Sequence, residues 1–539
     1  MIKKRISLLL FYYFTGCLLS YAQTQRICAT PEHDKYLRSV NPAYAKERDE
    51  MEDKIAAYKA SHIYQRNSAA TLVIPVVVHI VWNTAEQNLS DEQIISQIDV
   101  LNEDYSITNA NIAEVPSVWA NLVGSSHIFF SLARRDENQL PTTGIVRRQT
   151  DTVSFDTGDE MKYNNKGGSN AWDRNHFLNI WVCNLENAGQ DILGYAEYPT
   201  SVNSETDGIV INYQAFGRLG SNLKPQYNLG RTATHEIGHW LNLQHTWGDD
   251  AGACNGNDNI DDTPNQGDAT YGCPSYPHVS CANEPDGDMF MNYMDYTDDK
   301  CMMLFTTDQR SRMDAAITTF RDTLYDAASY AESVTPLATD LRIREINSPA
   351  GVVCNKNIDP VLNIKNAGTN TISSFSVDYS VDGDTLQYDW SGTLAPGAEL
   401  NLTLPEILIS EELHTFIVNV ISVNGGSDDY KIDNFKTRSF LYAPGKYDCP
   451  DYPETPDISI YPTAASESIL IVTKYKDTGQ KTILSIYNVL GKKMYSREYV
   501  DSQGQSVNVY VGGLANGVYF AEVKTYNKQV SKKFVVRHQ

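Results

Sequence analysis

The segment from residue 234 to residue 248, THEIGHWLNLQHTWG, constrains the fold more than any other part of this chain. His235 and His239 are four residues apart, so a helix here turns both imidazoles to one side. Glu236 flanks that point, where a carboxylate can take a proton from a metal-bound water. His245 follows six residues after His239 and reaches the same point only if the helix ends first. The segment therefore predicts a helix that stops beside a three-histidine metal site.

The expected break in this helix lies at Asn242, and asparagine tolerates a left-handed backbone better than other residues except glycine. Three neutral histidines with one open position are typical of a catalytic zinc, whereas four protein ligands close a structural site. The H-E-x-x-H pattern alone arises by chance in about one chain in a hundred of this length. The third histidine makes chance rarer, so zinc binding by His235, His239 and His245 is favoured over unrelated surface histidines.

A second motif, Asn292-Tyr293-Met294-Asp295-Tyr296, places a methionine in a predicted tight turn, as metzincin metalloproteases do beneath their zinc. The chain resembles the pappalysin family of metzincins in HEIGHWLNLQHTWGD, in the DDTP segment at residues 261–264, in NYMDY and in CMMLFT. Upstream, IPVVVHIVW, LNEDY, AWDRNHFLNIWV and LGYAEYP are also similar, so the resemblance covers residues 24–325. One departure is Asn242, where metzincins usually carry glycine.

The resemblance implies a multidomain chain that begins with an α+β metzincin catalytic domain, here expected at residues 68–332. It implies a zinc endopeptidase that hydrolyses peptide bonds in extracellular proteins, with Glu236 as general base and Met294 below the zinc. Dense Val and Ile at residues 72–82, and the segments 129–133, 178–182 and 208–211, predict strands. Residues 90–105 and 307–325 predict helices.

Residues 194–196 resemble the edge strand that pairs with an extended peptide substrate in metzincins. Gly194, Tyr195 and Ala196 would then hold the substrate through backbone hydrogen bonds. An ordinary edge strand has the same sequence pattern.

Length and charge limit the other classes of function. A chain of 539 residues is expected to form several domains, and its net charge of −23 argues against nucleic acid as a partner. Residues 1–22 predict an export signal, because a basic start and an apolar run precede Ser20-Tyr21-Ala22. No other stretch is long and apolar enough to predict a transmembrane segment. We expect the mature chain to be monomeric and secreted, or retained on the cell surface.

Residues 23–67 predict a polar pro-segment with a short helix near residues 50–58. It contains Cys28 within Arg26-Ile27-Cys28, and a thiolate can fill the open position of a zinc site. The resemblance implies that Cys28 blocks the zinc and keeps the enzyme latent. An incidental free thiol, or a disulfide with Cys183, is the alternative.

The stretch after the zinc motif is acidic and rich in cysteine. Asp258, Asp261, Asp262 and Thr263 are closely spaced oxygen donors of the kind that Ca²⁺ prefers, and the resemblance also implies calcium; a solvated acidic loop is the alternative. The resemblance favours disulfides Cys254–Cys281 and Cys273–Cys301, although spacing allows three pairings.

Tyr296 lies two residues after Met294 and is a candidate to stabilise the oxyanion, with a buried structural role as the alternative. The pocket beyond the scissile bond is ambiguous. Asp298 and Asp299 favour a basic side chain, and Lys300 opposes that preference.

Two β-rich regions follow. Alternating strands at residues 336–442 predict an immunoglobulin-like β-sandwich, either a spacer or a surface-binding module. Residues 457–539 contain IYNVLG, GLANGVY and KKFVV and resemble the small C-terminal β-sandwich sorting domain of type IX secretion, which implies export by that machinery. Cys354 and Cys449 are either free or paired. The function alternative to a secreted zinc endopeptidase is a surface-binding protein with an inactive protease fold.

Overall fold

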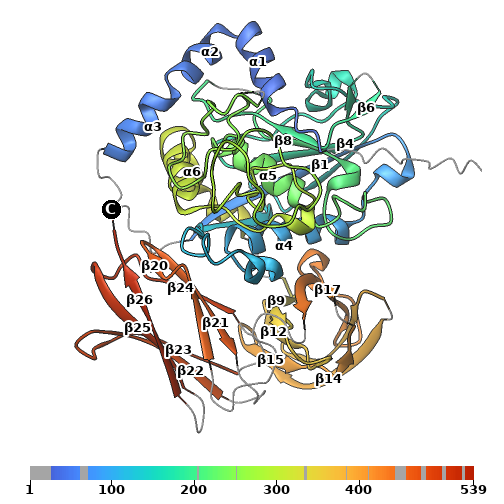
Figure 1. Ribbon diagram of the computed structural model, residues 1–539. Helices are drawn as coiled ribbons and strands as arrows, with labels where there is room; N and C mark the ends of the chain where they lie inside the picture. The colour runs from blue at the N-terminus through green and yellow to red at the C-terminus, as the bar shows by residue number, and fades with distance from the viewer. Residues whose placement is uncertain are drawn as a thin grey trace, which may run out of the picture.

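The computed structural model describes residues 26–539 except residues 61–70, 188, 203–204, 251, 333–336, 384, 411, 444–456, 475–480, 501–505, 525–528 and 539. The predicted export signal and Cys449 lie outside the described residues. Figure 1 shows the catalytic unit above two β modules, with helices α1 to α3 along its upper edge. Among the helices that the structure describes, none is long and apolar enough to cross a bilayer.

A six-stranded sheet organises the catalytic unit, in the order β2-β1-β4-β8-β7 with β3 paired to β1. Its pairs are parallel except β7–β8, and β7 lies at the edge. The central strand is apolar on both faces and almost wholly buried, as expected for a covered parallel sheet. The strands are β1 (Leu72–Trp82), β2 (Ile128–Leu132), β3 (Ile145–Gln149), β4 (Leu178–Cys183), β7 (Gly194–Ala196) and β8 (Ile209–Asn212). Four of them match the predicted segments within one residue.

Two helices pack on one another beneath this sheet, α4 (Asp91–Tyr105) and α5 (Arg231–Trp240). The Ser90 side chain caps α4 by accepting a hydrogen bond from the backbone N–H of Gln93. Every residue of α5 is buried, so its histidines are held inside the protein.

The closing helix α6 (Thr307–Phe320) is shorter than the predicted 307–325. Its backbone leaves the helical conformation at Arg321, whose buried guanidinium pairs with Asp207 at 2.8 Å and lies over the Trp240 ring. A 3-10 helix, η8 (Asp322–Ala331), then packs against β1. The prediction was wrong there because a tertiary ion pair, invisible in the local pattern, turns the chain.

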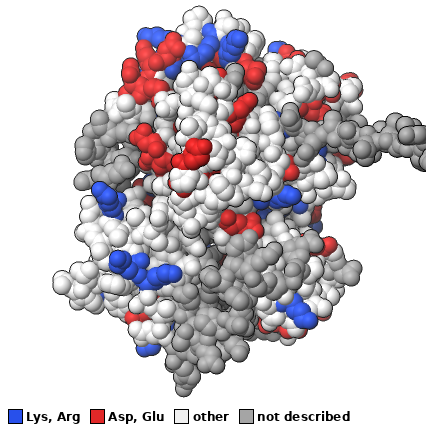
Figure 2. All heavy atoms as spheres, viewed as in Figure 1, with Lys and Arg blue, Asp and Glu red and all other residues white. Residues whose placement is uncertain are grey.

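The predicted pro-segment forms three helices instead of one, α1 (Thr30–Val40), α2 (Pro42–Asp49) and α3 (Met51–Ala60). On the solvent side, Figure 2 shows acidic and basic side chains next to one another at the top of the molecule. Exposed pairs such as Arg38–Asp49 contribute little stability. The segment is held instead by apolar burial, since Met51 and Ile55 pack against α6.

The lower half of the catalytic unit is mostly irregular chain between α5 and α6. Two disulfides, Cys254–Cys281 and Cys273–Cys301, cross-link it. A cross-linked loop loses less entropy on folding, which compensates for the scarcity of helices and strands.

The next region contains a five-stranded sheet, β10-β18-β17-β13-β14, and a three-stranded sheet, β15-β12-β9, that share one apolar core. The strands are β9 (Leu341–Ser348), β10 (Gly351–Val353), β12 (Val361–Asn366), β13 (Ile372–Val381), β14 (Leu386–Leu394), β15 (Glu399–Thr403), β17 (Glu412–Val423) and β18 (Phe435–Tyr442), with a separate pair β11 (Asn357–Ile358) and β16 (Ile407–Leu408). Strand β18 docks on α4, where the buried Glu103–Arg218 pair also binds Thr437 and Ser439.

The C-terminal module has two sheets, β19-β21-β24 and β20-β26-β25-β22-β23, around its own core. Its strands are β19 (Asp457–Tyr461), β20 (Ala464–Ala465), β21 (Ser468–Lys474), β22 (Lys481–Asn488), β23 (Lys493–Val500), β24 (Ser506–Tyr510), β25 (Gly517–Lys524) and β26 (Gln529–Val536). Glu467 joins this module to the catalytic unit through ion pairs with His127 and Arg310.

Candidate metal centre

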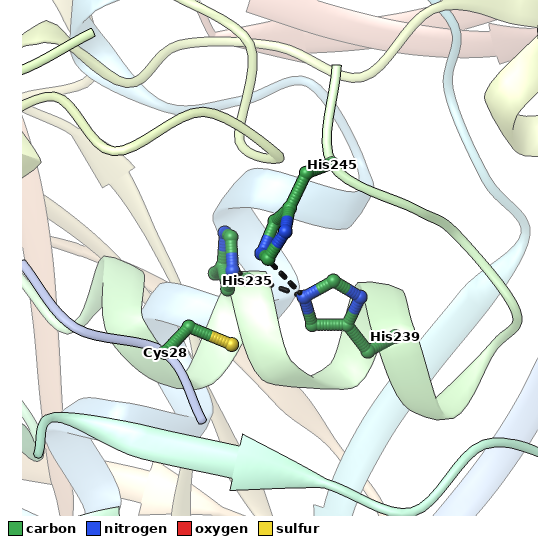
Figure 3. Close-up of side chains that lie close together, drawn as sticks. All are labelled: Cys28, His235, His239 and His245. Atoms are coloured by element: carbon green, nitrogen blue, oxygen red, sulfur yellow. Dashed lines mark hydrogen bonds between the residues drawn. The ribbon is translucent and has the colours of Figure 1, made fainter. Parts of the chain in front are cut away.

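Three histidines converge at the end of α5, as Figure 3 shows. His239 Nε2 lies 3.1 Å from His235 Nε2 and 3.1 Å from His245 Nε2. All three side chains are fully buried. His245 reaches the other two because Asn242 has φ +72° and turns the chain back after the helix.

The hydrogen bonds of the opposite ring nitrogens fix which nitrogen carries the proton. His235 Nδ1 lies 2.7 Å from the Tyr293 carbonyl oxygen, His239 Nδ1 2.8 Å from that of Leu243, and His245 Nδ1 2.7 Å from Asp249 Oδ1. Carbonyl and carboxylate oxygens accept hydrogen bonds, so each Nδ1 is the protonated donor and each Nε2 presents a lone pair.

The lone pair of His239 Nε2 lies 3.1 Å from each of the other two, and lone pairs this close repel unless a cation lies between them. Nitrogens bound tetrahedrally to zinc at about 2.0 Å would be about 3.3 Å apart, close to the observed spacing. Burial and the neighbouring histidines lower the pKa values of His235 and His239, which keeps both rings neutral and able to bind a metal. The donor set therefore fits zinc.

Met294 lies directly beneath the helix that carries two of these histidines. A Cβ atom added at Gly238 would lie 2.5 Å from Met294 Sδ, so glycine is needed where the two segments meet. Both the methionine and the Tyr293 carbonyl that orients His235 come from the same turn. The turn therefore fixes the position of helix α5 at Gly238 and the orientation of the His235 ring.

Glu236 lies next to the three histidines and is almost fully buried. Burial raises the pKa of its carboxyl to about 7, although hydrogen bonds from Thr30 and Cys28 oppose this shift. A carboxylate with a pKa near neutrality can both accept and return a proton.

The Cys28 side chain fills the open side of the centre (Figure 3). One ligand atom each of Cys28, His235, His239 and His245 lies within 4.8 Å of the others, and no other group of this kind occurs among the described residues. The thiol also donates to Glu236 Oε2 at 3.4 Å. Burial and the Glu236 charge raise the pKa of Cys28, so a thiolate there requires a compensating cation.

The chain around Cys28 pairs with the edge strand β7. Cys28 and Gly194 form a parallel bridge, with Ala29 N–H donating to Gly194 O and Leu193 N–H donating to Ile27 O, both at 2.9 Å. Thr30 Oγ1 donates to Glu236 Oε2 and accepts from Ala196 N–H, also at 2.9 Å. The backbone groups of the predicted substrate strand are therefore already occupied.

Arg26 lies at the other end of α5 from Asn242. Its guanidinium donates to Asp299 Oδ1 at 2.6 Å and to Thr232 Oγ1 at 3.2 Å, and it is buried. Asp299 is buried too, whereas Asp298 is partly exposed and Lys300 is exposed. Of the three residues considered for the substrate pocket, Asp299 is the one that forms an ion pair with Arg26 of the predicted pro-segment.

The Tyr296 ring lies close to two of the histidines, tilted against His235 at a centroid distance of 5.7 Å and edge-on to His245 at 4.9 Å. Its hydroxyl donates to the Cys28 carbonyl oxygen at 3.2 Å. The phenol thus points toward the blocked open side of the centre.

The residues predicted to bind calcium are brought together only in part. Thr263 Oγ1 donates to Asp258 Oδ2 at 2.8 Å, whereas Asp262 Oδ2 accepts from Asp308 N–H at 3.0 Å and Asp261 is exposed. Burial raises the pKa of Asp258 to about 7 and that of Asp262 to about 6. Asp262 Oδ1 is buried without a hydrogen-bond partner.

The cysteines outside the cross-linked loop differ in whether they are free or disulfide-bonded. Cys28 and Cys183 are free and buried, which excludes the disulfide that was the alternative for Cys28. Cys354 is disulfide-bonded.

Three residues of the site were not singled out from the sequence: Asp249, Thr30 and Tyr198. Asp249 holds His245, Thr30 holds Glu236, and the Tyr198 hydroxyl lies 3.4 Å from His239 Nδ1. The four-residue spacing of His245 and Asp249 was the only signal available, because the other two contacts depend on chain folding.

Comparison with known proteins finds two matching families, one within the catalytic unit and one in the C-terminal module. Residues 161–318 match the family described as "Pregnancy-associated plasma protein-A", and residues 459–537 match the family described as "Secretion system C-terminal sorting domain". An extracellular metalloprotease of Pyricularia oryzae is 32% identical over 47% of this chain and 77% of its own length. One from Neurospora crassa is 34% identical over 49% of this chain and 80% of its own.

Among solved structures, a promirolysin mutant from Tannerella forsythia is 46% identical, with a TM-score of 0.52. The match covers 58% of this chain and all of that one. The sorting domain and the extracellular relatives make this a secreted or cell-surface protein that uses the type IX route. Its relatives imply a catalytic metal and peptide substrates. This chain belongs to the pappalysin family of metalloendopeptidases.

Proposed function

We propose that this protein is a zinc-dependent endopeptidase that is made in a latent form. The observation that carries the proposal is the meeting of three unprotonated Nε2 atoms beside a buried carboxylate. In this proposal His235, His239 and His245 bind zinc and Glu236 is the general base. A surface-binding protein would gain nothing from keeping this donor set complete.

The reaction follows from the positions of the side chains. When bound, zinc supplies Lewis acidity that activates a water and polarises the scissile carbonyl. The edge strand β7 holds the extended substrate through the Gly194 and Ala196 backbone groups now used by the pro-segment. Glu236 takes the proton of the attacking water and returns it to the leaving amine. The Tyr296 hydroxyl donates a hydrogen bond to the developing oxyanion.

Latency follows from the same contacts. Cys28 occupies the fourth ligand position, Thr30 binds Glu236, and the backbone at Ile27 to Ala29 occupies the substrate strand. Removal of residues 23–67 would release all three together.

We also propose domain boundaries, a calcium site and an oligomeric state for this chain. The catalytic domain spans residues 68–332, and residues 336–442 form an immunoglobulin-like sandwich, supported by two sheets that share one core. Asp258, Asp261, Asp262 and Thr263 provide ligands for a structural Ca²⁺, supported by the buried, unpartnered Asp262 Oδ1. The protein acts as a monomer.

Casein hydrolysis tests the proposed function. Wild type is expected to cleave casein until a zinc chelator is added, and Glu236→Ala is expected to lose at least about a thousandfold in kcat while it keeps its zinc. Equal cleavage by the two proteins would show that the assignment is wrong. Elemental analysis without bound transition metal would show the same.

The lag before activity tests latency. Cys28→Ala is expected to shorten the lag severalfold, because a water replaces the thiolate as fourth ligand. Cys183→Ala is the matched control, since Cys183 is also free and buried but lies away from the histidines. An unchanged lag in Cys28→Ala, or an equal change in both variants, would contradict the role of Cys28.

A further inference from the structure

A second arginine of the pro-segment, Arg48, reaches into the catalytic unit at the far end of α5 from Arg26. It lies on helix α2, yet its side chain is only 6% exposed. Its guanidinium carbon lies 3.9 Å from the centroid of the Tyr198 ring, and Nη1 donates to Asn242 Oδ1 at 3.4 Å. A helical surface residue has therefore been buried in a pocket beside the metal ligand His239.

The walls of this pocket divide between the two parts of the chain. Asp34, which accepts from Arg48 Nε at 2.9 Å, belongs to the pro-segment and leaves with it. Tyr198 and Asn242 belong to the catalytic unit and remain. Both are buried in the latent form, at 5% and 0% exposure, so departure of Arg48 uncovers them.

The pocket that remains suits a cation. It keeps the π face of Tyr198 and the Asn242 amide oxygen, the two contacts of the guanidinium that belong to the catalytic unit. A second guanidinium, that of Arg312, donates from Nε to the backbone oxygen of Asn242 at 2.7 Å.

The pocket also lies where substrate must pass. Tyr198 follows the edge strand β7 by two residues, and its hydroxyl lies 3.4 Å from His239 Nδ1. A peptide that pairs with β7 therefore extends past Tyr198, a few residues from the scissile bond.

We propose that the released enzyme binds a cationic side chain of its substrate, arginine or lysine, on the Tyr198 ring and the Asn242 amide oxygen. This subsite rests on the proposed function, and Arg48 occupies it in the latent chain. Its place at the Asn242 end of α5 separates it from the pocket at Asp299, which lies at the other end.

Peptides that differ at one position test the subsite. Each peptide carries either arginine or its neutral isostere citrulline at one position near the scissile bond. The activated wild-type enzyme is assayed on each peptide, and kcat/KM is measured. At one position arginine is expected to raise kcat/KM about tenfold over citrulline. Tyr198→Leu and Asn242→Gly are each expected to abolish most of that ratio, since Gly keeps the left-handed turn and loses the amide. Tyr198→Phe keeps the ring and is expected to keep the ratio.

A binding measurement gives a readout that does not need turnover. Glu236→Ala, clipped by a trace of wild-type enzyme, is expected to bind a fluorescent arginine peptide about tenfold more tightly than its citrulline twin, and Tyr198→Leu in that background removes the difference. Equal binding of the two peptides, or an arginine preference that survives Tyr198→Leu, would overturn the proposal. If a zinc chelator stops cleavage of the citrulline peptides, the endopeptidase assignment holds whether or not the cationic subsite exists.

Discussion

The metal centre and the acidic loop after it both gather potential metal ligands, but the structure treats them differently. At the centre, four ligand atoms from Cys28 and three histidines lie within 4.8 Å of one another. In the loop, Asp258 contacts Thr263, Asp262 turns to α6, and Asp261 faces solvent. The histidines are carried by a buried helix and a fixed turn, whereas the acids lie on irregular chain held by disulfides.

This difference shows how a site obtains its geometry. Helical spacing and a Met294 contact position the histidines before any metal binds, so the centre depends on packing. The acids have no such support. Burial raises the pKa values of Asp258 and Asp262, and the charge of Asp308 adds to the rise at Asp262. We expect the loop to need its disulfides, and the proposed calcium ion, to become ordered.

The largest expected effect separates the two regions directly. His245→Ala is expected to lower zinc affinity and kcat at least about a thousandfold, because it removes one of three ligands. Asp262→Ala is the matched change in the loop and is expected to leave zinc content unchanged while it lowers thermal stability. Zinc content by elemental analysis and casein cleavage check both. If the two variants lose zinc to a similar extent, the claim that the metal centre binds zinc independently of the loop is wrong.

The next effect concerns the cross-links of the loop. Replacing both cysteines of the Cys254–Cys281 pair by alanine is expected to lower the free energy of unfolding by about 3 kcal/mol, since this bridge closes a loop of 27 residues. Thermal unfolding measures this, with Cys183→Ala as the control for removal of a buried free cysteine. A melting temperature that does not fall would show that the loop is ordered without its bridge.

The smallest effect is a pH dependence. The folded pKa of Asp258, about 7, lies above its ordinary 3.8, so the folded state binds the proton more tightly. Without calcium, its contribution to stability is therefore fully present below about pH 4 and is lost as the pH rises through 7, with a fall of about 2.5 kcal/mol between pH 5 and pH 8. Asp258→Asn is expected to remove this fall in the free energy of unfolding, because asparagine does not titrate.

Calcium should reverse the trend in wild type, because a bound cation stabilises the ionised carboxylate. Denaturant unfolding at pH 5 and pH 8, with and without calcium, measures both effects. If calcium does not raise the stability of wild type at pH 8, the loop is a solvated acidic segment and the proposed calcium site is wrong.

The sequence predicted the elements whose pattern is local. Dense Val and Ile marked β1, and Ser90 marked the start of α4. Predictions were less complete where distant residues decide the backbone. The pro-segment has three helices where one was expected, and Arg321 ends α6 through its pair with Asp207.

The site shows the same division. Histidine spacing predicted which residues meet, and Asn242 predicted the turn that lets His245 return. The sequence could not predict that Thr30 binds Glu236 or that Tyr198 lies beside His239, since 206 and 41 residues separate those partners.

By itself, the sequence determined that His235, His239 and His245 meet beside Glu236, because short-range spacing on a helix fixes which side chains share a face. Only the tertiary structure decided that Cys28 lies against the three histidines and strand β7 while Arg48 lies over the Tyr198 ring. Those contacts join segments far apart in the chain, and packing of the whole molecule brings them together.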